Sequence, residues 1–72
     1  ILYYNYIMSK YNTIREQLRV EADKKYQSTI HTYLIDIESR NMQDEFCDQY
    51  VKLLDVGFHP YDCLLAFMKG VK

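Results

Sequence analysis

The chain has 72 residues, which is the size of one domain with a modest hydrophobic core. Its net charge of −1 provides no overall attraction to nucleic acid or anionic membranes, and its 49% of hydrophobic residues argues against a disordered linker. Two cysteines are too few for a disulfide framework, and no apolar run reaches the roughly 18 residues that a membrane span needs. We expect residues 1–72 to form a single helical domain, standing alone or as part of a larger protein.

Apolar residues in the first half of the chain recur in steps of three and four, as in an amphipathic helix. This stripe comprises Tyr4, Ile7, Tyr11, Ile14, Leu18, Ala22, Tyr26 and Ile30. Because the β-branched residues within 28–32 lower the helix propensity, we expect one helix over about residues 2–26 and another over about residues 29–38. A continuous rod about 57 Å long is the alternative, since the first 56 residues contain neither Gly nor Pro.

The segment 39–41 is predicted to separate this region from a third helix. Asn41 is a residue type that favours the N-cap position, and Asp44 and Glu45 suit the first turn that follows it. This helix is expected to run from Met42 to about residue 56. Gly57 can then end it in the left-handed conformation, with a hydrophobic residue directly after it.

A short last helix is predicted from Pro60, which suits a first helical turn, to the residue before Gly70. It is apolar on nearly every side, so it either fills the core or contacts another chain. The fold class is therefore all-α, a small bundle of three to four helices. A long N-terminal helix would be followed by a helical hairpin and a short C-terminal helix.

Two histidines and two cysteines are the candidate metal ligands or nucleophiles. His59 and Cys63 are four residues apart, but His31 and Cys47 are separated by 16, unlike the closely spaced pairs of zinc sites. No Gly-rich turn supports a nucleophile, and a helical core keeps a thiol protonated. We therefore predict no enzyme, no cofactor and no catalytic or metal-binding residue. Reduced, buried cysteines favour an intracellular compartment; the localisation is otherwise unknown.

The charges are divided unevenly along the chain. Residues 1–31 carry five basic and three acidic side chains, whereas residues 32–62 carry two basic and seven acidic ones. Packing of oppositely charged helices within the fold explains this division. The alternative function is nucleic-acid binding through the basic side of the N-terminal helix, where tyrosines are interleaved with Lys10, Arg15, Arg19, Lys24 and Lys25.

One short segment resembles a known family. Residues 55–58, with the Gly57-Phe58 pair, and the helix after them look like the glycine-aromatic loop of ubiquitin-associated domains. The resemblance implies a loop that contributes to ubiquitin binding. A helix stop at Gly57, with Phe58 folded back onto the helix, explains the same residues, and we assign no family from this likeness.

The N-terminal segment contains more apolar residues than one helix face can bury. Residues 1–8 are apolar at every position except Asn5, and tyrosine is favoured in interface cores. We predict a non-enzymatic protein–protein interaction or assembly module with a protein partner or a homo-oligomer, no membrane span and no strong preference for nucleic acid. The predicted partner-binding residues are Leu2, Tyr3, Tyr6, Ile7 and Tyr11.

Overall fold

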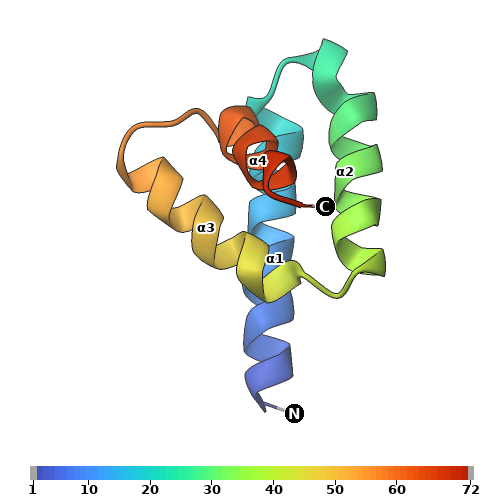
Figure 1. Cartoon of the computed structure of the whole chain (residues 1–72), viewed down its shortest axis with the longest axis vertical. Coiled ribbons are helices and arrows are strands. Elements are labelled where there is room, and N and C mark those ends of the chain that lie inside the picture. The colour runs from blue at the N-terminus through green and yellow to red at the C-terminus, as the bar shows by residue number, and fades with distance from the viewer. Residues whose placement is uncertain (1, 72) are drawn as a thin grey trace.

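The computed structural model describes the backbone of residues 2–71 and the side chains from residue 6 to residue 71. It contains four α-helices, α1 (Leu2–Glu21), α2 (Gln27–Ser39), α3 (Gln43–Asp55) and α4 (Pro60–Lys69), and a 3₁₀ turn, η1 (Lys24–Tyr26). No strand occurs among the described residues, so the prediction of an all-α bundle is confirmed. Helix α1 runs along the long axis of the molecule, and α2, α3 and α4 all pack against it (Figure 1).

The first two helices meet at a corner near residues 22–26. The prediction of a first helix that reaches residue 26 is therefore wrong, and the alternative of one continuous rod is wrong as well. Helix α1 ends at Glu21, and the backbone of Asp23 turns out of the helical region with a ψ of 142°. The Asp23 carboxylate accepts a hydrogen bond from the Lys25 amide at 3.2 Å, which caps η1. The Gln27 side chain then donates to three carbonyl oxygens at the end of α1, those of Leu18, Arg19 and Ala22.

Two tight turns join the last three helices, and both have the same pattern of backbone hydrogen bonds. Gly57, with φ of 103°, donates to the Leu54 carbonyl while Phe58 donates to Leu53. Asn41 has a φ of 57°, and its amide donates a hydrogen bond to the Glu38 carbonyl while the Met42 amide donates to the Ile37 carbonyl. These are Schellman motifs. The break at 39–41 and the stop at Gly57 are confirmed, but Asn41 closes α2 and does not cap α3.

Helix α4 begins as the sequence predicts. His59 is its N-cap and its Nδ1 accepts a hydrogen bond from the Tyr61 amide at 3.3 Å, while Pro60 occupies the first turn. Tyr61 also stacks on Tyr26 of η1, with ring centroids 4.3 Å apart and ring planes 15° from parallel. This contact ties the corner between α1 and α2 to the start of the last helix.

The core lies between the four helices, and Phe46 of α3 joins three of them. Its ring packs edge-on against Tyr11, Tyr50 and Phe67, with centroids 6.1, 5.6 and 5.3 Å away. The buried residues of this core cluster are Tyr11, Ile14, Leu18, Ala22, Ile30, Leu34, Ile37, Phe46, Cys47, Tyr50, Cys63 and Leu64. The Tyr11 hydroxyl donates to Glu38 at 2.8 Å and the Tyr50 hydroxyl donates to Gln17, so both buried phenols are hydrogen-bonded.

Candidate functional site

The N-terminal turns of α1 extend beyond the other three helices along the long axis of the molecule (Figure 1). Ile7 precedes Tyr11 by four residues and so lies on the same face of α1. Tyr11 is fully buried, whereas Ile7 is only half-buried. The apolar stripe of α1 therefore continues past the point where the bundle covers it. Tyr6, which is 61% exposed, Ile7 and the half-buried Met8 form what we call the N-terminal surface.

The predicted partner-binding residues separate into three groups. Tyr6 and Ile7 lie on the N-terminal surface. Tyr11 does not, because its ring is enclosed by the core and its hydroxyl is bonded to Glu38, so the folded chain does not present it to a partner. The side chains of Leu2 and Tyr3 lie outside the described residues, and their role remains a prediction.

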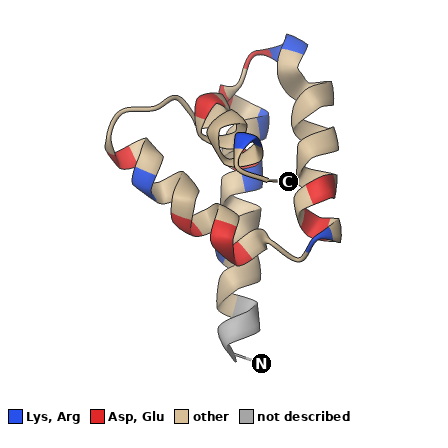
Figure 2. Ribbon diagram, viewed as in Figure 1, with Lys and Arg blue, Asp and Glu red and all other residues tan. Residues whose placement is uncertain are grey.

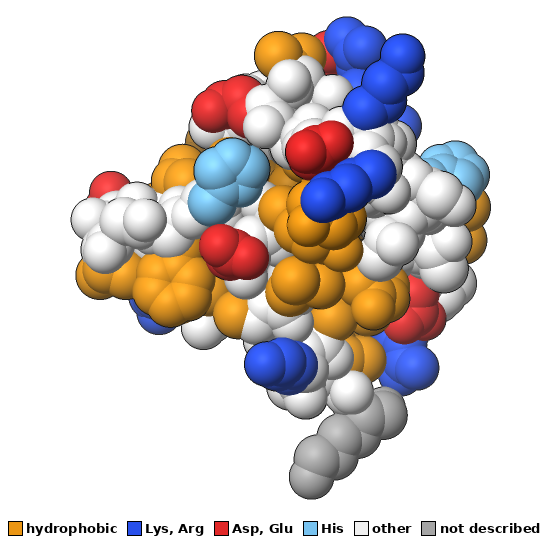
Figure 3. Space-filling view, turned by 90° about the horizontal axis from the view of Figure 1, so that it is seen from above, with side chains coloured by type: hydrophobic (Ala, Val, Ile, Leu, Met, Phe, Trp, Pro, Cys, Tyr) orange, Lys and Arg blue, Asp and Glu red, His pale blue; other side chains and the backbone are white. Residues whose placement is uncertain are grey.

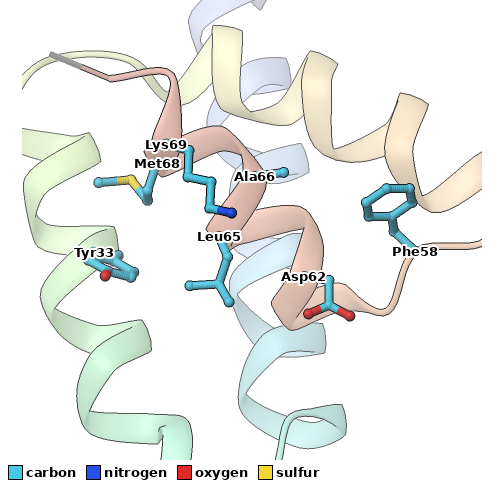
Figure 4. A pocket seen from close by; sticks show the side chains of 7 residues that line it. All are labelled: Tyr33, Phe58, Asp62, Leu65, Ala66, Met68 and Lys69. Carbon is cyan, nitrogen blue, oxygen red and sulfur yellow. The ribbon is translucent and has the colours of Figure 1, made fainter.

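A second apolar surface lies on α4, and we call it the α4 groove. It is a hollow of about 490 Å³ lined by Tyr33, Phe58, Asp62, Leu65, Ala66, Met68 and Lys69. Figure 4 shows Tyr33 of α2 and Phe58 of the α3–α4 turn on opposite sides of Leu65 and Ala66. A view of the molecule from above shows hydrophobic side chains gathered at the centre, with charged side chains around them (Figure 3).

The all-round apolar character of the last helix is the sequence signal for this groove. Cys63 and Leu64 enter the core, whereas Leu65 and Ala66 are only half-buried and line the groove. The prediction that this helix fills the core is thus confirmed for one side of it, whereas contact of the other side with another chain stays a prediction. The residues that come from elsewhere in the chain, Tyr33 and Phe58, could not be assigned to this groove without the fold.

The basic side chains of α1 are partly neutralised within the chain. Arg19 forms an ion pair with Glu16, and Arg15 lies 3.8 Å from Glu38 of α2. The Lys10 ammonium lies over the Tyr6 ring, 5.9 Å from its centroid. Acidic residues lie along α3 and at the C-terminal end of α2, while the lysines of η1 lie at the opposite end of α2 (Figure 2). This geometry leaves no continuous basic face along α1 in the described residues.

The cysteines lie inside the core, as predicted. Cys47 and Cys63 are free thiols and both are buried, and this burial raises the pKa of both thiols. A protonated, enclosed thiol is a poor nucleophile. Among residues whose side chains are described, no three His, Cys, Asp or Glu side chains gather closely enough to hold a metal ion.

Within the part of the chain that the structure describes, no helix is both long enough and apolar enough to cross a membrane. No protein family, no curated protein and no solved structure matches this chain. The candidate sites therefore rest on their own geometry.

Proposed function

We propose that this chain is a non-enzymatic protein–protein interaction or assembly module, and that it binds through the N-terminal surface. The observation that carries the proposal is the continuation of the α1 core stripe beyond the bundle, where Ile7 is only half-buried and Tyr6 is exposed. Burial of apolar surface contributes about 25 cal/mol per Å², so an uncovered stripe of this kind favours association.

A second copy of the chain is the simplest partner, because closed pairs of identical chains are the commonest protein assemblies. The test is sedimentation equilibrium of the chain over a wide concentration range. We expect self-association that the double variant Tyr6→Ser, Ile7→Ser weakens by about tenfold or more, with its helix content by circular dichroism close to that of the native chain.

The matched control is Val20→Ser, since Val20 is 66% exposed near the other end of the same helix. It should leave the association unchanged. A native chain that stays monomeric at every concentration, or a double variant that associates as tightly as the control, would overturn the proposal.

Salt separates this proposal from the alternative of nucleic-acid binding. Apolar association should persist between low and moderate salt, whereas binding to nucleic acid through Lys10, Lys24 and Lys25 would fall steeply. A strong, salt-sensitive shift of a short single-stranded oligonucleotide, without self-association, would favour the alternative.

A further inference from the structure

We propose that Tyr26 and Tyr61 form an oxidative cross-linking site, at which a one-electron oxidant of the haem-peroxidase class joins the two rings into dityrosine. The new carbon–carbon bond connects η1 to the first turn of α4. This inference goes beyond the proposed function and does not rest on it, because neither tyrosine belongs to the N-terminal surface.

The stacking of the two rings is the first argument. Their centroids are 4.3 Å apart and their planes lie 15° from parallel, so the face of one ring lies against the face of the other. Two phenol rings that are held together need no diffusional encounter before they react, which favours coupling within the pair. The other ring contacts between described side chains all involve Phe46, so this stack is the one that joins two tyrosines.

Access to an oxidant is the second argument. Both rings are half-buried, and both line a hollow of about 710 Å³ that is also lined by Glu21, Asp23 and Asp62. These three acidic residues are exposed, so the hollow is open to water. A phenol releases its proton when it loses an electron, and a carboxylate or a water molecule beside the ring can accept that proton. The hollow therefore offers both an approach for the oxidant and acceptors for the protons.

The other described tyrosines are less suited to this reaction. Tyr11 and Tyr50 are fully enclosed by the core, and their hydroxyl groups donate hydrogen bonds to other residues. Tyr6 is exposed and Tyr33 is half-buried, but among the described side chains no second tyrosine ring stacks on either of them. The chain also has no tryptophan that would compete for the oxidant, and both of its thiols are buried.

The reaction balances as two one-electron steps. Each phenol gives one electron to the oxidised haem of the peroxidase and its hydroxyl proton to a base, which leaves two phenoxyl radicals. The radicals couple through a Cε carbon of each ring, because the ring position opposite the oxygen already carries the side-chain Cβ. Each coupled carbon then loses its proton while the oxygen regains one, so both rings become aromatic phenols again. Hydrogen peroxide takes up the two electrons and two protons and becomes two molecules of water.

The cross-link would give the domain a covalent closure that its cysteines do not provide. Cys47 and Cys63 are free thiols, whereas a bond between Tyr26 and Tyr61 closes the chain between these positions into a loop. Such a bond restricts the unfolded state, as a disulfide does. Oxidation at this site would therefore hold η1 and the start of α4 together permanently.

The test exposes the folded chain, at low concentration, to one equivalent of hydrogen peroxide and a catalytic amount of a haem peroxidase. Trypsin cleaves after Lys and Arg, so it places Tyr26 in the peptide 26–40 and Tyr61 in the peptide 53–69. We expect these two peptides to be recovered as one cross-linked pair, lighter than their sum by two hydrogen atoms. The pair should come from material that migrates as a monomer on a denaturing gel.

Phenylalanine variants identify the reacting residues. Tyr26→Phe and Tyr61→Phe each keep a ring in the stack but remove the phenol, so each should abolish the cross-linked pair of peptides. Tyr33→Phe is the matched control, because Tyr33 lies in the same tryptic peptide as Tyr26, and it should leave the yield unchanged. Circular dichroism checks that all three variants keep the native helix content.

Oxidation of the native chain in concentrated urea tests whether the stack selects this pair, even if a variant fails to fold. In urea, the product of Tyr26 and Tyr61 should fall to the level of cross-links between other tyrosines, since no folded contact holds the two rings together. A yield from the folded chain no higher than this, cross-links only between separate chains, or a pair that survives in Tyr26→Phe would each refute the assignment of this site. The proposed function would stand in each case, because it concerns different residues.

Discussion

Among the residues that the structure describes, two adopt the left-handed conformation, and each follows the end of a helix. Gly57 has no atom within 4 Å of the position that a Cβ would occupy, so a side chain there would meet no steric obstacle. Its φ of 103° is nevertheless a conformation that residues with a Cβ rarely adopt. The cost of a substitution at Gly57 is therefore backbone strain alone.

We expect Gly57→Ala to lower the free energy of unfolding by about 1–2 kcal/mol. The matched variant Asn41→Gly occupies the equivalent position after α2 and should change it by less than about 0.5 kcal/mol, because Gly also tolerates this conformation. Urea unfolding followed by circular dichroism measures both. Equal stability of Gly57→Ala and the native chain would show that Gly57 does not hold a left-handed turn in solution.

These two turns also show what could be predicted residue by residue. Glycine is the residue type most favoured in the left-handed position that ends a helix, and a hydrophobic residue follows Gly57, so the helix stop was predictable. Asn41 belongs to a residue type that is common both as an N-cap and in the left-handed conformation. Only the backbone bonds from Asn41 to Glu38 and from Met42 to Ile37 decide between them, and these depend on how α3 leaves α2.

At the scale of elements, the corner between α1 and α2 is the main difference from the prediction. The apolar stripe continues in steps of four through Leu18, Ala22, Tyr26 and Ile30, so the periodicity gives no sign of a break. These residues are buried or half-buried on both sides of the corner. The break comes instead from polar groups, since Asp23 caps η1 and Gln27 binds the last carbonyls of α1.

We expect Gln27→Met to lower the free energy of unfolding by about 1 kcal/mol, because it keeps the length of the side chain but removes its hydrogen bonds to the α1 carbonyls. The control is Gln49→Met on α3, where the glutamine is exposed, and it should change stability by less than about 0.5 kcal/mol. Thermal and urea unfolding of the three proteins provide the measurement. A loss no larger for Gln27→Met than for the control would mean that the Gln27 bonds do not hold the corner.

The bounds of α3 and α4 were closer to prediction. The predicted range of about 42–56 compares with Gln43–Asp55, and Pro60–Lys69 is the range expected for the last helix. Gly57 and Gly70 favour helix ends and Pro60 favours a helix start, and the packed helices end and begin at these positions. The α4 groove was not predictable in the same way, because Tyr33 and Leu65 come together only when α2 folds against α4.

The molecule as a whole should lose stability at alkaline pH. Burial raises the pKa of Tyr11, assisted by its hydrogen bond to Glu38, and burial also raises the pKa of Tyr50. The folded state thus keeps both phenols protonated when the unfolded chain, with an ordinary tyrosine pKa near 10, has begun to release the protons. Stability from these groups is fully present below about pH 10 and is lost as the pH rises above it.

We expect the free energy of unfolding to fall above about pH 10 by up to about 1.4 kcal/mol per pH unit for each buried tyrosine. The buried thiols of Cys47 and Cys63 act in the same direction from about pH 9, because their pKa is raised as well. Urea unfolding at a series of pH values measures the fall, and Tyr50→Phe should reduce its slope. A free energy of unfolding that stays constant up to pH 11 would contradict the burial of these tyrosines.

The stacked rings of Tyr26 and Tyr61 have a consequence for how the folded chain opens. They join η1 to the first turn of α4, so moving either segment away from the other breaks this contact. In amide hydrogen exchange, the corner that follows α1 and the first turn of α4 should then belong to one cooperative unit and become exposed together. The first turn of the last helix would then be stabilised against local opening by an aromatic contact with a residue 35 positions earlier in the sequence.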